Sequence, residues 1–136
     1  MIVLHKVHKP SNFIFDALSN METFATLHPV VNKIEFISSE QYLFFESLKI
    51  GPFSFAFTYP ASVHPIKAQQ RIIMKAIIFG KIFLDVYFDI SRENGFSLVR
   101  EEIKISTWLP IRTAMKMIVV KHHKQLFANL ENMCYA

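Results

Sequence analysis

The spacing of hydrophobic and polar residues changes along the chain, and each spacing predicts a different element. Residues 2–9 are rich in apolar and β-branched side chains and stop at Pro10, which is typical of a strand. Apolar residues at three- and four-residue steps then predict a short helix up to Met21 and a second one over residues 22–27. The second helix should end at His28, because proline disfavours helical backbone in the residue before it.

Between residues 30 and 107 the apolar residues recur with period two, which predicts strands. Turn signals divide this stretch into about six strands: Ser38-Ser39-Glu40, Gly51-Pro52, His64-Pro65, Gly80 and Asn94-Gly95. The last five of these strands are expected at residues 41–50, 53–61, 67–79, 81–92 and 96–107. Sequential strands joined by tight turns favour an antiparallel meander.

The last segment returns to helical spacing. Pro110 suits a first helical turn, and no glycine or proline follows it. One stripe of the expected helix carries Ile111, Met115, Ile118, Val119, His122, Leu126, Leu130 and Met133. Such a helix needs a partner surface, and the sheet is the only large one. We therefore predict an α+β fold, in which a curved antiparallel sheet of about seven strands wraps around a long C-terminal helix, with two short helices after the first strand.

This order of elements resembles the START-like superfamily (SRPBCC), the helix-grip group that includes the birch-pollen allergen and polyketide cyclases. The matching segments are KPSNFIFDALSN after the first strand, TFATLHPVV at the second helix, the Gly51-Pro52 turn after YLFFESLKI, and the closing helix from Pro110. The resemblance implies that residues 1–136 form a single START-like ligand-binding domain. It also implies a hydrophobic or amphipathic small molecule, such as a lipid, sterol or polyketide, bound between the sheet and the helix.

Independently of the resemblance, alternating apolar residues could form the wall of such a cavity. Rings occupy every second position of the strand that starts at Phe53, and methionines would add adaptable lining. The predicted ligand-binding residues are Phe53, Phe55, Phe57, Tyr59, Met74, Leu84, Val86, Phe88, Ile103, Met115, Ile118 and His122. The alternative interpretation is that these side chains form a solid core.

Three polar residues occupy apolar positions: Glu46, Glu101 and His122. A buried carboxylate must be paired, hydrated or neutralised. The three are candidates to orient a polar group of the ligand, or to act as an acid–base pair if two of them meet. The competing interpretation is that they face outward. His28 is a further candidate at the mouth of the cavity.

Composition and charge exclude several classes of function. Hydrophobic residues make up 51% of the chain, which argues against disorder. The net charge is +4, and the last helix is the most basic element. Elsewhere the basic residues are scattered among acidic ones, with no stripe interleaved with aromatic rings, so nucleic-acid binding is not expected. Weak contact with an anionic membrane surface is compatible with this charge. The histidines lack metal-ligand spacing and the three glycines form no phosphate loop, so we expect no metal and no cofactor.

The apolar runs are too short for a signal peptide or a spanning helix, and the single Cys134 suits a reducing compartment. These features predict a cytoplasmic protein, either a monomer or a homodimer. The leading functional hypothesis is a non-catalytic carrier or sensor of an apolar ligand. The alternatives are a cyclase-, dehydrase- or hydrolase-type enzyme that uses Glu101 or Glu46 with His122, and a protein-interaction module without a ligand.

Overall fold

A computed structural model describes residues 1–134, except for the side chain of Ile50, and it contains seven strands and three α-helices. In chain order these are β1 (Ile2–Val7), α1 (Ser11–Ser19), α2 (Met21–Leu27), β2 (Val31–Ser38), β3 (Gln41–Ile50), β4 (Phe53–Ile66), β5 (Arg71–Ile78), β6 (Ile82–Arg92), β7 (Ser97–Ser106) and α3 (Arg112–Glu131). The strands form one antiparallel sheet in the order β1-β7-β6-β5-β4-β3-β2. The predicted fold class is therefore confirmed.

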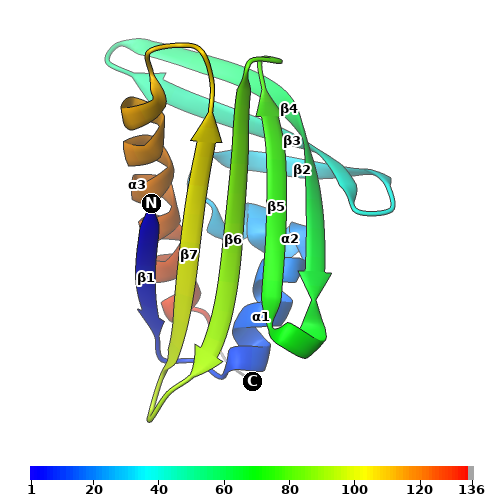
Figure 1. Ribbon diagram of the computed structural model, residues 1–136, viewed down its shortest axis with the longest axis vertical. Helices are drawn as coiled ribbons and strands as arrows, with labels where there is room; N and C mark the ends of the chain where they lie inside the picture. Colours follow the sequence, from blue (N-terminus) through cyan, green and yellow to red (C-terminus); the bar gives the residue numbers. More distant parts are fainter. Residues whose placement is uncertain (135–136) are drawn as a thin grey trace.

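The three helices lie behind the front strands in Figure 1, and α3 runs alongside β1 and β7. Between these layers lies a core whose fully buried members include Val7, Ile14, Leu18, Ile72, Phe88, Val99, Ile103, Leu126 and Leu130. These residues come from four strands and from α1 and α3, so the same apolar contacts hold these two helices against the sheet.

One predicted turn is wrong. His64 and Pro65 lie inside β4, where they pair with Ile73 and Ile72 of β5. The fixed φ angle of proline is compatible with extended backbone, so the strand continues through it. The chain reverses just beyond, through the short 3-10 turn Lys67–Gln69 and a left-handed Gln70 with φ of 51°.

Strand β4 is paired with β5 along only the second part of its length. It pairs with β3 from residue 53 to residue 62, but with β5 only from Ala61 to Ile66. Figure 1 shows the β3–β4 hairpin turning away from β5 and extending above α3. The first half of β4 therefore has no strand partner on the β5 side, and the sheet opens there.

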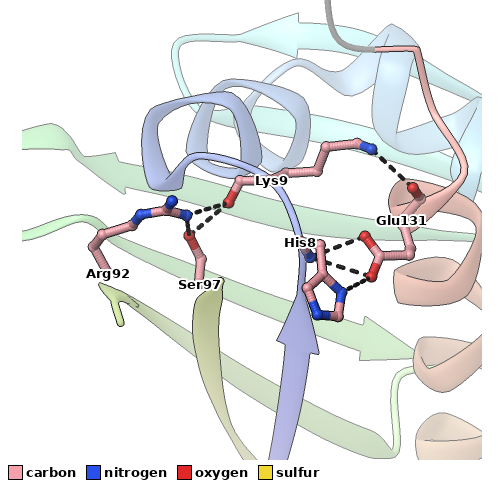
Figure 2. A network of polar contacts seen from close by, with 5 residues as sticks. All are labelled: His8, Lys9, Arg92, Ser97 and Glu131. Carbon is pink, nitrogen blue, oxygen red and sulfur yellow. Dashed lines mark hydrogen bonds and ion pairs between the residues drawn. The ribbon is translucent and has the colours of Figure 1, made fainter. Parts of the chain in front are cut away.

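The C-terminal end of α3 is fixed by a polar network, which Figure 2 shows. Glu131 accepts hydrogen bonds from the backbone N–H of His8 at 2.9 Å, and its carboxylate contacts Nδ1 of the same histidine at 2.5 Å. Lys9 Nζ donates to the carbonyl oxygen of Glu131 at 2.9 Å. Ser97 and Arg92 in turn donate to the carbonyl oxygen of Lys9 at 2.7 and 3.1 Å. The network joins α3 to the ends of β1, β6 and β7.

Candidate functional site

A cavity of about 410 Å³ lies where β4 is separated from β5, between the β3–β4 hairpin, the end of β5, β6 and α3. Its lining residues are His28, Glu46, Leu48, Phe55, Ala56, Phe57, Tyr59, Ile78, Phe79, Ile82, Leu84, Met115, Ile118, Val119, His122 and His123. A smaller hollow of about 40 Å³ shares His28, Tyr59, Leu84 and His123 with it. The cavity is therefore lined mainly by apolar side chains. Its polar groups belong to His28, Glu46, His122 and His123 and to the hydroxyl of Tyr59.

Most of the predicted ligand-binding residues line one of these two spaces. The main cavity is lined by Phe55, Phe57, Tyr59, Leu84, Met115, Ile118 and His122, and the smaller hollow by Met74 and Val86. The other three lie elsewhere: Phe53 is 65% exposed at the start of β4, and Phe88 and Ile103 are fully buried in the core. Period-two spacing gives the face of a strand but not the position along it, which explains these differences.

Glu46 and Tyr59 form the polar pair of the cavity. They lie on the adjacent strands β3 and β4, and the Tyr59 hydroxyl donates a hydrogen bond to Glu46 Oε2. Burial raises the pKa of Glu46, and the hydrogen bond from Tyr59 opposes this rise in part. Burial also raises the pKa of Tyr59, and the neighbouring carboxylate raises it further. The phenol therefore stays protonated and its donor is committed to Glu46.

Glu101 lies at the centre of a second polar cluster, outside the set of residues that line the cavity. Its carboxylate is fully buried and contacts Nε2 of His5 at 2.8 Å and Nδ1 of His123. Burial by itself would raise the pKa of Glu101, but the charges and hydrogen bonds of the two histidines outweigh it and lower the pKa to about 2. His5 stacks on Phe127 with ring centroids 4.1 Å apart, which fixes its orientation.

The structure corrects the predicted acid–base pair, because Glu101 contacts His123 and not His122. The buried residues of α3 are Val119, His123, Leu126, Phe127 and Leu130. Val119, Leu126 and Leu130 belong to the predicted stripe, whereas His123 and Phe127 do not. His122 instead lies half-buried at the wall of the cavity. Sequence reasoning missed His5 and His123, although both continue apolar patterns: His5 alternates with Val7, and His123 lies four residues from Val119 and from Phe127.

His28 follows α2 and is a buried member of the lining. Its Nδ1 accepts a hydrogen bond from the backbone N–H of Val30 at 3.3 Å. Its ring centroid lies 5.8 Å from that of His122 and 5.7 Å from that of His123. Burial, followed by the repulsion of His123 and His122, lowers the pKa of His28 to about 2, so the ring is neutral at pH 7.

Residues 1–134 contain no cluster of three or more histidine, cysteine or acidic side chains that could hold a metal ion. Among the same residues, no helix is both long and apolar enough to cross a membrane.

Comparison with known proteins finds the same fold at low sequence identity. No family model and no curated protein matches the chain. Among solved structures, Ara h 8.0201 has a TM-score of 0.75 at 12% identity, and the match covers 96% of this chain and 93% of that one. A START superfamily protein from Mycobacterium smegmatis has a TM-score of 0.73 at 15% identity, with the same coverage.

A third similar structure is the di-domain ARO/CYC StfQ from the steffimycin biosynthetic pathway, with a TM-score of 0.77 at 13% identity. That match covers 96% of this chain and 45% of StfQ. At these identities the likeness shows a shared fold, whereas function must be argued from the site itself.

Proposed function

We propose that the chain binds a hydrophobic or amphipathic small molecule between the sheet and α3, and that it acts as a carrier or sensor. The premise of this proposal is that the chain has the helix-grip fold of the START-like superfamily. The observation that supports this most is the cavity of about 410 Å³ with its mainly apolar wall. Ligand pockets usually measure about 300–1,000 Å³ and combine an apolar wall with a few polar groups. The named structural neighbours include a START protein and an ARO/CYC protein.

Burial of the ligand's apolar surface would supply most of the affinity, at about 25 cal/mol for each Å² removed from water, before the costs of association. The rings of Phe55 and Phe57 belong to the wall, and Phe57 stacks against Tyr59 with centroids 6.1 Å apart. The polar groups of Glu46 and His28 would orient the ligand.

A second candidate is acid–base chemistry on a ligand held in the same cavity. It is favoured by Glu46, since a carboxyl group with a raised pKa inside a cavity is typical of a general acid. His122 lines the same cavity, but among residues 1–134 no hydrogen bond joins it to Glu46. Glu101, the other carboxylate considered, is bonded to His5 and His123. We therefore place binding before catalysis.

The test is a fluorescence titration with N-phenyl-1-naphthylamine, a neutral apolar probe, together with native mass spectrometry of the freshly purified protein. We expect saturable binding of the probe and its displacement by a competing apolar ligand. Phe57→Asn should weaken binding about tenfold or more, because a buried phenylalanine contributes about 1.5–3 kcal/mol. Phe36→Asn is the matched control, because Phe36 is 68% exposed on β2 and is not part of the lining.

No saturable binding by the wild-type protein, with no small molecule retained in native spectra, would contradict the proposed function. Turnover of a bound ligand that Glu46→Gln abolishes would instead favour the enzyme.

A further inference from the structure

The wall of the cavity carries no unpaired cation that could neutralise an anionic ligand. Its lining includes neither lysine nor arginine, and its one acidic residue is Glu46. Burial lowers the pKa values of His28 and His122, so both are neutral near pH 7. The remaining imidazole, that of His123, contacts the carboxylate of Glu101. A ligand carboxylate would therefore be desolvated without a counter-ion, which is strongly unfavourable.

Hydrogen-bonding groups of both kinds are nevertheless present. Glu46 Oε2 accepts from Tyr59, whereas Oε1 has no hydrogen-bond partner among residues 1–134. His28 uses Nδ1 as an acceptor for Val30 N–H, so in the neutral ring the proton is on Nε2. That Nε2–H, on the other side of the ring, also lacks a partner in the described part of the chain. The lining thus offers one unused acceptor and one unused donor.

We propose that this cavity selects amphiphiles with an uncharged hydroxyl head group, such as phenols and alcohols, over carboxylates with the same apolar body. A hydroxyl group both donates and accepts, so it matches Glu46 Oε1 and His28 Nε2–H without bringing a charge. This inference rests on the proposed binding function. It adds the chemical class of the ligand.

The volume of the cavity favours a small apolar body. A cavity of about 410 Å³ lies at the small end of the usual range of about 300–1,000 Å³ for ligand pockets. A two-ring aromatic molecule with one head group fits this volume.

The experiment is isothermal titration calorimetry at pH 7.5 with naphthalene, 2-naphthol and 2-naphthoate, which share one apolar body. We expect 2-naphthol to bind at least tenfold more tightly than 2-naphthoate, and more tightly than naphthalene. If 2-naphthoate binds as tightly as 2-naphthol, the selectivity is overturned while the binding function stands. If naphthalene equals 2-naphthol, recognition of the hydroxyl is overturned. If none of the three binds, the binding function fails as well.

A charge introduced into the wall tests the cause. Met115 lines the cavity, and Met117, two residues further along α3, is 65% exposed and lies outside this lining. We expect Met115→Lys to reduce the preference for 2-naphthol over 2-naphthoate at least fivefold, because the ammonium supplies the missing counter-ion. Met117→Lys should leave the preference unchanged. An unchanged preference in a folded Met115→Lys protein would contradict the missing counter-ion as the cause of the selectivity. If that variant does not fold, the titration of the wild-type protein decides whether the selectivity exists.

Discussion

Glu101 shows how much a single buried charge depends on its neighbours. Its carboxylate is fully buried between His5 and His123, and loss of the negative charge would leave both imidazoles without their partner. We expect Glu101→Gln to lower the free energy of unfolding by about 3 kcal/mol, the cost typical of breaking a buried pair from one side. Urea unfolding at pH 7 measures this change.

The adjacent Glu102 provides the control. It points to the other face of β7 and contacts Lys104 at 3.9 Å, and its side chain is 29% exposed. Glu102→Gln should cost less than about 1 kcal/mol, as is usual for exposed ion pairs. Equal losses in the two variants would show that the buried cluster has no special role in stability.

His28 predicts a pH dependence of stability. The folded protein keeps this ring neutral, since its pKa is about 2, whereas the unfolded chain protonates it below its ordinary pKa of 6.5. The unfolded state therefore binds more protons as the pH falls, and stability decreases. Between pH 7 and pH 5 we expect a loss of about 2 kcal/mol from this residue, at 1.4 kcal/mol for each pH unit below 6.5.

Urea unfolding at pH 7 and pH 5 should show this loss in the wild type and much less of it in His28→Gln. The exposed His64, changed to glutamine in the same way, should behave like the wild type. Glu101 does not affect the comparison between pH 7 and pH 5. The stability that its low pKa contributes is lost only below its ordinary pKa of 4.5, as the pH falls towards 2. The same pH dependence in His28→Gln and the wild type would contradict the prediction.

At the scale of single residues, the spacing predicted that Glu46 and Glu101 interrupt apolar faces, and both side chains do lie inward. It did not predict their partners. Tyr59 and Glu46 meet through the register of β3 and β4, and Glu101 meets His123 through the rotation of α3 about its axis. Register and helix rotation are set by packing across the whole core, which periodicity within one segment does not contain.

At the scale of elements, the clearest signals were turns that need special backbone. The strand at residues 41–50 and the place of the Asn94-Gly95 turn were predicted as the structure has them, and within that turn Gly95 has a positive φ of 81°. The His64-Pro65 signal failed because proline restricts a strand less than it restricts a helix. The long β4, and with it the opening of the sheet, was therefore not predicted.

The network at Glu131 leads to a prediction for one end of α3. The hydrogen bond from His8 lowers the pKa of Glu131, so the carboxylate remains charged down to acidic pH. Glu131→Gln should increase hydrogen exchange about threefold or more in the last turn of α3, because the helix end loses the contact of its carboxylate with His8. Global stability should change by less than about 1 kcal/mol, since the pair is partly exposed.

Hydrogen exchange followed by mass spectrometry checks this result. Glu35→Gln, at the exposed Lys33–Glu35 pair on β2, serves as the control and should leave α3 unchanged. Exchange that is equally slow in Glu131→Gln and the wild type would show that apolar packing alone holds this helix end.

For the whole molecule, the sequence was sufficient for the order of elements and for the packing of α3 against the sheet. It was not sufficient for the boundary between solid core and cavity. Phe57 and Phe88 follow the same alternating pattern, yet one lines the cavity and the other is fully buried beside Phe127. The difference arises from the departure of β4 from β5, which is a property of the assembled sheet. Oligomeric state and contact with anionic membranes stay predictions.

The separation of β4 from β5 also affects how fast a ligand could enter and leave the cavity. No ladder of backbone hydrogen bonds joins residues 53–60 of β4 to β5, so the two can separate there without unfolding any of the sheet. Across this gap lies a contact between the rings of Phe57 and Phe79, whose centroids are 5.2 Å apart. Release of a bound molecule would then require these two rings to separate. Phe79→Ala should therefore shorten the residence time of the ligand, as measured by stopped-flow dissociation, whereas Phe36→Ala should not.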